Sequence, residues 1–286
     1  MKPDVGSTAR APGGAARTVS AAPHAQGGPL QRIGLPALML LGLLLAWELL
    51  VRLAQIPAYT LPAPSLIAQT LAANAPSLAA SWWNTLQITL GALALACAGG
   101  VLIAAVFALS PTLERAFFPV AVVLQVTPIV AVAPLILIYV DSTTAALLLC
   151  AWIVAFFPIL SNTVVGLRAV DRHLAELFQL YRATRWQRLA LLRAPSALPY
   201  FLAGLKISGG LSLIGAVTAE MVAGAAGRDT GLASRILEAS FRTETPKMFA
   251  ALALLVLTGV LIFGLLHALS RAWLGPREGS ESQGWD

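Results

Sequence analysis

Long apolar runs without a single charged residue dominate the chain. Such runs occupy residues 53–113, 116–140, 142–167 and 248–270. Each is at least as long as the roughly 20 apolar residues that cross a bilayer core as a helix. Together with the apolar stretches after Arg32 and Pro199, they predict six membrane helices at about 33–54, 82–109, 117–140, 144–165, 200–222 and 248–270.

The composition agrees with a membrane protein and argues against a soluble domain. Of the 286 residues, 58% are hydrophobic and 11% are charged, against about 45–50% and about 25% in soluble domains. The net charge of +6 would suit a nucleic acid partner, but the sequence has no basic run with interleaved aromatic residues. Cys97 and Cys150 lie inside apolar runs without metal-ligand spacing. We therefore expect an all-α integral membrane protein without a metal site and without a nucleic acid partner.

The distribution of Lys and Arg predicts the orientation. Connections on the side of the N-terminal tail hold thirteen of these residues, and those on the opposite side hold four. By the positive-inside rule, both termini are expected in the cytoplasm. We expect a disordered cytoplasmic tail at 1–32, a membrane domain at 33–274 and a short cytoplasmic tail at 275–286. A cleaved signal peptide is the alternative for the N-terminus, but no clear small-residue cleavage site follows the first apolar run.

Three connections carry helical patterns of their own. Short helices are expected at about 65–73 and 231–241, on the side opposite to the termini. The cytoplasmic connection 166–199 is longer, and apolar residues recur at helical spacing across 171–190. Pro195 and Pro199 are expected to end this helix before the fifth span. An amphipathic helix held between two spans either lies on the lipid surface or docks on a soluble partner.

The cytoplasmic connection resembles the EAA motif of binding-protein-dependent ABC importer permeases. Its counterparts here are Glu176-Leu177-Phe178, Tyr181-Arg182-Ala183-Thr184 and the small-residue and proline stretch 194–199. Further matches to the nitrate, sulfonate and taurine (NitT/TauT) branch follow in order at 47–48, 61–65, 84–86, 127–135, 156–163 and 219–221. The stretches 208–217 and 231–233 are more similar to permeases for pyrimidine, thiamine-precursor or riboflavin uptake.

Two residues depart from the family pattern. Arg182 stands where the family usually has Gly, and Arg favours helix over Gly and does not share its tolerance of positive φ. The turn that the family forms there is therefore expected to be straighter or stiffer in this chain. Asp141 also stands where Gly is common, which leaves the tightness of that turn open.

The resemblance implies the type I ABC importer permease (MetI-like) fold, with six transmembrane helices and a cytoplasmic coupling helix. It implies a multi-pass permease subunit of the bacterial inner membrane that forms the translocation pathway for a small solute. That solute would be an organic anion such as a sulfonate, taurine or nitrate, or a compound resembling a pyrimidine, a thiamine precursor or riboflavin. The implied partners are a second permease copy, a dimer of ABC ATPase subunits that bind ATP and Mg²⁺, and a periplasmic or extracellular solute-binding protein. The motif implies ATPase-coupling roles for Glu176, Leu177, Phe178, Tyr181, Arg182, Ala183, Thr184, Arg185 and Trp186.

The sequence carries no ATP-binding or catalytic motif. No G-x-x-x-x-G-K-[ST] phosphate loop occurs, so the chain cannot hydrolyse ATP as P-loop proteins do. We expect a non-catalytic subunit that binds no cofactor and takes its energy from a partner. The alternative is a secondary transporter or channel driven by an ion gradient, which would place ionisable groups near mid-membrane. The second, third and fourth predicted spans contain no Asp, Glu, Lys or Arg.

Polar residues within the spans are candidates for the translocation pathway or gate. They are Gln125, Thr127, Asn162, Ser208 and Glu220. The four uncharged side chains could line a pore or form hydrogen bonds between helices. Glu220 could act in an outer gate or contact the outer loop. In the first span, Glu48 lies one turn before Arg52, and a structural ion pair is expected there.

Overall fold

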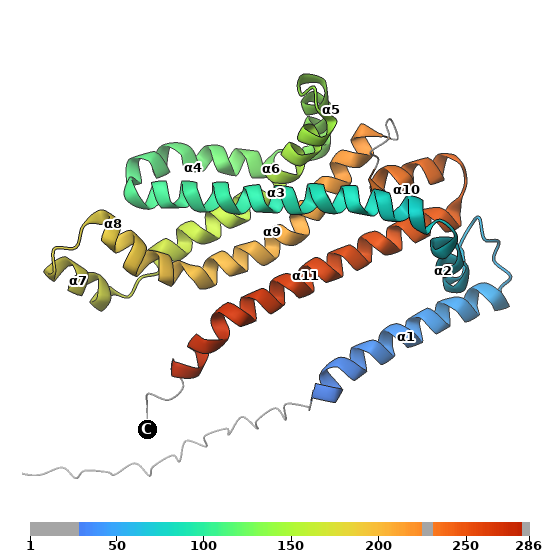
Figure 1. Cartoon of the computed structure of the whole chain (residues 1–286), viewed down its shortest axis with the longest axis horizontal. Coiled ribbons are helices and arrows are strands. Elements are labelled where there is room, and N and C mark those ends of the chain that lie inside the picture. The colour runs from blue at the N-terminus through green and yellow to red at the C-terminus, as the bar shows by residue number, and fades with distance from the viewer. Residues whose placement is uncertain (1–28, 225–230, 282–286) are drawn as a thin grey trace, which may run out of the picture. The chain divides into compact units, whose positions relative to one another are not determined.

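The computed structural model describes residues 29–224 and 231–281, which are helical and form no strand (Figure 1). Helix α1 (Pro29–Leu53) lies largely in a first unit that ends at Ala46, and all later elements lie in a second unit that begins at Trp47. These elements are α2 (Pro64–Ala73), α3 (Ala75–Leu109), α4 (Pro111–Val126), α5 (Ile129–Tyr139), α6 (Thr143–Arg168), α7 (Arg172–Leu180), α8 (Arg185–Arg188), the π-helix η1 (Leu189–Arg193), α9 (Ala194–Ala223), α10 (Leu232–Phe241) and α11 (Thr245–Glu281).

Five of the six predicted membrane helices are confirmed, and most of them are longer than the apolar pattern gave. Residues 34–53, α3, α6, the continuous helix 185–223 and residues 245–274 are each long and apolar enough to cross a bilayer. Helix α3 begins at Ala75, before the predicted start at 82, and α11 continues past 270 to Glu281. The short helices expected at 65–73 and 231–241 are α2 and α10. Of the expected tails, residues 1–28 and 282–286 lie outside the described residues.

The third span is broken rather than continuous, which corrects the prediction of one helix over 117–140. Helices α4 and α5 meet at a bend of 100°. Thr127 precedes Pro128 and is extended, with φ −66° and ψ 121°, because the proline ring disfavours helical geometry in the residue before it. Both the backbone N and the Oγ1 of Thr127 donate to the carbonyl oxygen of Val123, at 3.1 and 2.7 Å, and so close the end of α4.

Contacts across the bundle indicate that the bent pair still crosses the membrane once. Gly91 of α3 faces Leu148 of α6, and further along, Gly100 faces Ile159. Helices α3 and α6 therefore run in the same direction, so the chain between them must return from one side to the other. Consistent with this, Glu114 near the start of α4 forms an ion pair with Arg168 at the end of α6. Ala133 of α5 packs in the same core cluster as Leu147, near the start of α6.

Helices α6 and α9 pack antiparallel through small residues. Gly166 faces Ala197, and Gly204 faces the carbonyl oxygen of Pro158, only 2.7 Å from where a Cβ would lie. Gly215 faces the Cα of Ala151, at 2.9 Å from the same hypothetical position. Larger residues at these glycines would force the helices apart. Small residues are the usual means by which membrane helices approach closely.

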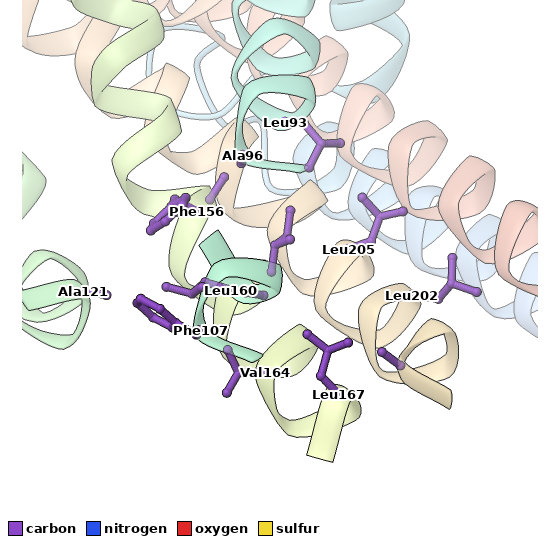
Figure 2. Close-up of a cluster of buried hydrophobic side chains, with 14 of the residues drawn as sticks. Leu93, Ala96, Phe107, Ala121, Phe156, Leu160, Val164, Leu167, Leu202 and Leu205 are labelled. Atoms are coloured by element: carbon purple, nitrogen blue, oxygen red, sulfur yellow. The ribbon is translucent and has the colours of Figure 1, made fainter. Parts of the chain in front are cut away.

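A buried apolar cluster surrounds this contact. Its members come from α3, α4, α6, α9 and α11, and include Leu93, Phe107, Phe156, Leu160 and Leu205 (Figure 2). Figure 2 shows side chains of α3, α6 and α9 converging, with Ala121 of α4 alongside. The cluster also contains Leu189 of η1 and so packs these helices together next to residues 169–193.

The ion pair expected in the first span is present and has a third partner. Arg52 Nε lies 2.6 Å from Glu48 Oε1. The hydroxyl of Ser65 donates to the same carboxylate at 2.7 Å, and the backbone N of Ser65 donates at 3.0 Å. Glu48 therefore also caps the first turn of α2, a role that the sequence pattern does not reveal.

Reporter fusions test the topology that follows from the parallel direction of α3 and α6. An alkaline phosphatase fusion after Thr143 is expected to be active, and fusions after Ser110 and Ala169 inactive, because the chain crosses the membrane once through α4 and α5 and again through α6. Activity is measured in intact cells and normalised to the amount of fusion protein. Equal activity after Ser110 and Thr143 would show that α4 and α5 form a re-entrant loop.

Candidate functional site

The predicted coupling segment forms two helices and a turn, which corrects the prediction of a single helix over 171–190. Asp171 caps α7 by accepting hydrogen bonds from the backbone N of His173 at 2.7 Å and of Leu174 at 3.3 Å. Helix α7 ends at Leu180, and α8 begins at Arg185. Thr184 and Gln187 form a reciprocal capping box at the start of α8. The sequence carries strong caps at both helix starts, so the break between them is encoded locally.

Arg182 keeps the turn that it was expected to straighten. Its φ of 51° places it in the left-handed region, as the glycine of a helix C-terminal motif would be. The backbone N of Ala183 donates to Phe178 O at 3.0 Å, and that of Arg182 donates to Gln179 O at 2.9 Å. These two bonds define a Schellman motif. The prediction of a straighter turn was wrong because these local hydrogen bonds, together with the cap of α8 that follows, outweigh the intrinsic preference of Arg. That the turn is stiffer stays a prediction.

Asp141, the other departure from the family pattern, does not adopt a positive φ. It lies in the short connection between α5 and α6, outside the set of described non-glycine residues with positive φ, which comprises Gln55, Arg182 and Thr243. The turn at this position therefore does not require a glycine, and Asp141 carries no backbone strain of that kind.

The apolar residues of the coupling segment are at the surface. Tyr181 is 80% exposed, Trp186 69% and Leu177 45%, while Phe178 is half-buried. A shallow cavity of about 300 Å³ lies among Leu177, Phe178, Tyr181, Ala183, Gln187 and Leu191. Glu176, Thr184 and Arg185 are also exposed. The structure thus brings the nine predicted coupling residues together in one segment with an uncovered apolar face.

The prolines after this segment do not end the helix, contrary to expectation. Helix α8, η1 and α9 form one continuous helix over residues 185–223. Pro195 is the second residue of α9 and Pro199 lies inside it, so neither proline is at a free helix start, where a missing N–H would be least costly. In the π-turn, the N–H of Ala194 donates to the carbonyl of Leu189, five residues back. This wider turn shifts the hydrogen-bond pattern by one residue just before Pro195, which has no N–H to donate. The coupling segment consequently continues into the fifth span without a non-helical break.

The candidate pathway residues lie in three places rather than in one site. Gln125 and Thr127 are next to the break in the third span, and Gln125 is exposed. Asn162 and Ser208 lie at the contact of α6 with α9: Asn162 Nδ2 donates to Pro158 O in its own helix at 2.8 Å. Ser208 is fully buried, and its hydroxyl donates to Ala155 O of α6 at 2.6 Å. For Ser208, a hydrogen bond between helices accounts for the polar group.

Glu220 lies at the far end of α9, fully buried against α10. Its Oε2 accepts a hydrogen bond from the backbone N of Ala233 at 3.0 Å, and its Oε1 has no partner. Thr85 of α3 accepts from the backbone N of Leu232 at 2.8 Å. Two adjacent helices thus satisfy the first amides of α10, which a helix cannot satisfy by itself. Gly231 faces the Glu220 carboxylate so closely that any side chain there would overlap it.

A second group of contacts fixes the body of α10. Arg235 Nε donates to Ser81 Oγ of α3 at 3.0 Å, and Arg235 Nη1 donates to Glu238 at 2.8 Å. The hydrogen bond from Arg235 holds the pKa of Glu238 below its usual range. We call the contacts of Ser81, Thr85 and Glu220 with α10 the α10 clamp. Sequence reasoning singled out Glu220 but not Ser81 or Thr85, because a Ser or Thr in an apolar helix carries no signal of a distant partner.

Comparison with known proteins gives a consistent set of relatives. Residues 96–275 match the family described as binding-protein-dependent transport system inner membrane component. The riboflavin transport system permease protein RibX of Chloroflexus aurantiacus is 37% identical, over 84% of this chain and 90% of its own length. The formylaminopyrimidine transport permease protein ThiX of Halalkalibacterium halodurans is 32% identical, over 84% and 94%. The taurine transport system permease protein TauC of Escherichia coli is 27% identical, over 80% and 84%.

Replacing Arg182 by Gly should stabilise the turn after α7. Gly relieves the cost of the left-handed conformation, roughly 1 kcal/mol, which corresponds to about fivefold slower exchange of the Ala183 amide. Hydrogen exchange of the full-length chain followed by mass spectrometry measures this. The control Arg185→Gly places Gly at the first residue of α8, where φ is not positive, and should accelerate local exchange. Unchanged or faster exchange in Arg182→Gly would contradict the strain at this position.

Removing the Thr85 hydroxyl should loosen the α10 clamp. Thr85→Val preserves the shape of the side chain but leaves the buried amide of Leu232 without a partner, at a cost of about 1–3 kcal/mol. Exchange of the Leu232 amide is expected to become at least about tenfold faster. Thr89→Val is the matched control, because Thr89 is equally buried and its hydroxyl bonds only to Thr85 O in its own helix. The same acceleration in both variants would argue against the clamp.

Proposed function

Because the chain belongs to the family of binding-protein-dependent transport system inner membrane components, it is a membrane permease subunit of an ABC importer, and we propose that its segment 171–193 couples an ATPase subunit to the membrane helices. The observation that carries this proposal is the continuous helix from α8 through η1 into α9. No non-helical segment separates α8 from the fifth span, so a displacement of α8 would be passed directly to that span.

The uncovered apolar face supplies the contact for the partner. Tyr181 and Trp186 expose large apolar surfaces on the segment between two membrane helices, and aromatic side chains are typical anchors of protein interfaces. In this proposal they fill a groove on the ATPase, with Arg182 and Arg185 at the rim. Glu176 and Thr184 flank the contact.

Closure of the ATPases on ATP and Mg²⁺ would then tilt α9 and the α6 helix packed on it. The proposed assembly has two permease copies, two ATPases on the cytoplasmic side and a solute-binding protein on the opposite side. Both chain termini would be cytoplasmic, as the asymmetry of Lys and Arg predicts. The coupling must be reciprocal, so the liganded binding protein favours the closed state of the ATPases. Helix α10 and Glu220 would take part in the outer gate, and Gln125, Thr127 and Asn162 would face the pathway.

For the solute, we propose a heteroaromatic compound of the pyrimidine or flavin type. Support comes from the two relatives named for riboflavin and formylaminopyrimidine, which share 37% and 32% identity with this chain over 84% of its length. The taurine permease shares 27% over 80%. Titrating the cognate solute-binding protein with riboflavin, a formylaminopyrimidine and taurine tests the assignment by calorimetry. Tight binding of taurine alone would contradict it.

Truncating Tyr181 should weaken the complex with the ATPase. For a central anchor the loss is on the order of 2 kcal/mol, or about 30-fold in affinity. The full-length chain and the ATPase are purified together, and their dissociation constant and coupled ATP hydrolysis are measured. Tyr139→Ala is the matched control, because Tyr139 is equally exposed, at 83% against 80%, but lies at the end of α5. If Tyr181→Ala bound like Tyr139→Ala, the segment would not be the docking element.

A further inference from the structure

An arginine-lined cavity lies on the inner side of the coupling segment. It has a volume of about 400 Å³ and lies between α7 and the adjoining ends of α3, α4 and α6. The charged residues that line it are Arg168, Arg172, Arg188 and Arg193 together with Glu114. We call it the arginine pocket. The exposed apolar face with Tyr181 and Trp186 is not part of its lining.

The pocket carries an excess of positive charge. Glu114 is its only acidic lining residue and is paired with Arg168. Within the described residues, Arg172, Arg188 and Arg193 form no ion pair with a carboxylate. Arg188 Nε donates to Ala183 O at 3.0 Å and Arg193 Nη1 donates to Ala108 O at 2.8 Å. These bonds fix both guanidinium groups and leave further N–H donors for an anion.

The floor of the same pocket is apolar. Phe107 and Leu192 are buried members of its lining, and Val164 and Leu167 continue the apolar surface along α6. An inorganic anion would satisfy the arginines but would leave the apolar side of the pocket without an apolar partner. An amphiphile with an anionic head and a hydrocarbon chain satisfies both.

The position of the pocket indicates the source of such a molecule. It opens where α3 ends at Leu109, α4 begins at Pro111 and α6 ends at Arg168, which is the boundary between apolar spans and the charged loop. A smaller cavity of about 250 Å³ shares Arg188 and Arg193 with it and adds Arg185. Basic pockets between membrane helices on the cytoplasmic side are typical sites for anionic lipid headgroups.

We propose that the arginine pocket binds an anionic phospholipid, with its phosphate on Arg172, Arg188 and Arg193 and the start of an acyl chain along Phe107 and Leu167. The bound lipid joins α7 to the ends of α3 and α6, and so holds the coupling segment in the orientation that presents its apolar face. The binding site itself does not depend on the proposed ATPase contact. Only the consequence for coupling rests on that function.

Lipid binding to the full-length chain tests the proposal directly. Native mass spectrometry of the detergent-purified protein is carried out with phosphatidylglycerol and with phosphatidylcholine of identical acyl chains. Phosphatidylglycerol is expected to bind at least about tenfold more tightly, because its headgroup is anionic and the pocket is basic. Equal binding of the two lipids would overturn the proposal.

Charge variants locate the site. Arg172→Gln should lower the preference for phosphatidylglycerol about threefold to fivefold. The double variant Arg172→Gln/Arg188→Gln should lower it at least about tenfold. Among the described residues, the Arg172 side chain forms no hydrogen bond that the single variant would break, whereas Arg188 Nε bonds to Ala183 O. The control Arg115→Gln/Arg271→Gln removes two exposed charges outside the pocket, from the same predicted side of the membrane. A control that lost the same preference would show general surface attraction instead of a pocket.

The same samples distinguish the lipid from two other occupants, a free anion and a partner protein. If inorganic phosphate at millimolar concentration displaced phosphatidylglycerol, or bound equally to the protein, the pocket would be a site for a free anion and the lipid proposal would fail. If Arg172→Gln weakened the ATPase complex but left the lipid preference unchanged, the pocket would be part of a protein interface, and the proposal would fail in that way. A loss of lipid preference with an intact Tyr181-dependent ATPase contact would support the lipid site on its own.

Discussion

The close antiparallel contact of α6 with α9 is the constraint on which the rest of the bundle depends. In a bilayer, apolar side chains gain little by exchanging lipid for protein, so helices associate through close packing and buried hydrogen bonds. Here Gly204 and Gly215 allow the backbones to approach, and the Ser208 hydroxyl bonds to Ala155 O across the contact. Helix α3 packs on α6 in the parallel sense and α11 packs on α9 through Gly209. The positions of α3 and α11 in the bundle therefore depend on the α6–α9 pair.

This contact also decides how movement can pass through the molecule. Helix α9 continues into the coupling segment through a π-turn, and two arginines of that segment bond to the carbonyls of Ala183 and Ala108. The second helix of the segment is therefore continuous with α9 and is bonded to the end of α3. Its apolar face has no contact in the described part of the chain that would bury Tyr181 or Trp186. An unburied aromatic face beside a helix that continues into a span supports the proposed docking of an ATPase subunit.

The opposite end of the bundle uses polar groups in a different way. The α10 clamp joins α10 to Ser81 and Thr85 of α3 and to Glu220 of α9, through the Arg235 side chain and two backbone amides. Buried polar groups are rarely left without partners, and here the helix start provides the donors that satisfy them. The remaining oxygen of Glu220 has no partner, so the clamp is a less completely satisfied contact than the one between α6 and α9.

The sequence by itself determined the class of fold, five of the six predicted spans, the two short helices α2 and α10, the ion pair of Glu48 with Arg52 and the family. These features depend on local composition and spacing, because an apolar run of sufficient length forms a helix wherever it lies in a bilayer. Charge asymmetry and the motif around Glu176 likewise are properties of the linear chain. The orientation of the termini and the roles of the coupling residues remain predictions.

Only the tertiary structure decided the features that join distant residues or change the path of the backbone. The continuous helix past Pro195 runs against the local preference of proline. The size of the bend at Thr127 and Pro128 is also not set by the proline, which only disfavours helical geometry at Thr127. Ser208, Thr85 and the arginine pocket acquire their partners from other helices. Periodicity records which face of a helix is apolar, but not which helix covers it. That choice is made by close packing among all the helices at once, which no local pattern contains.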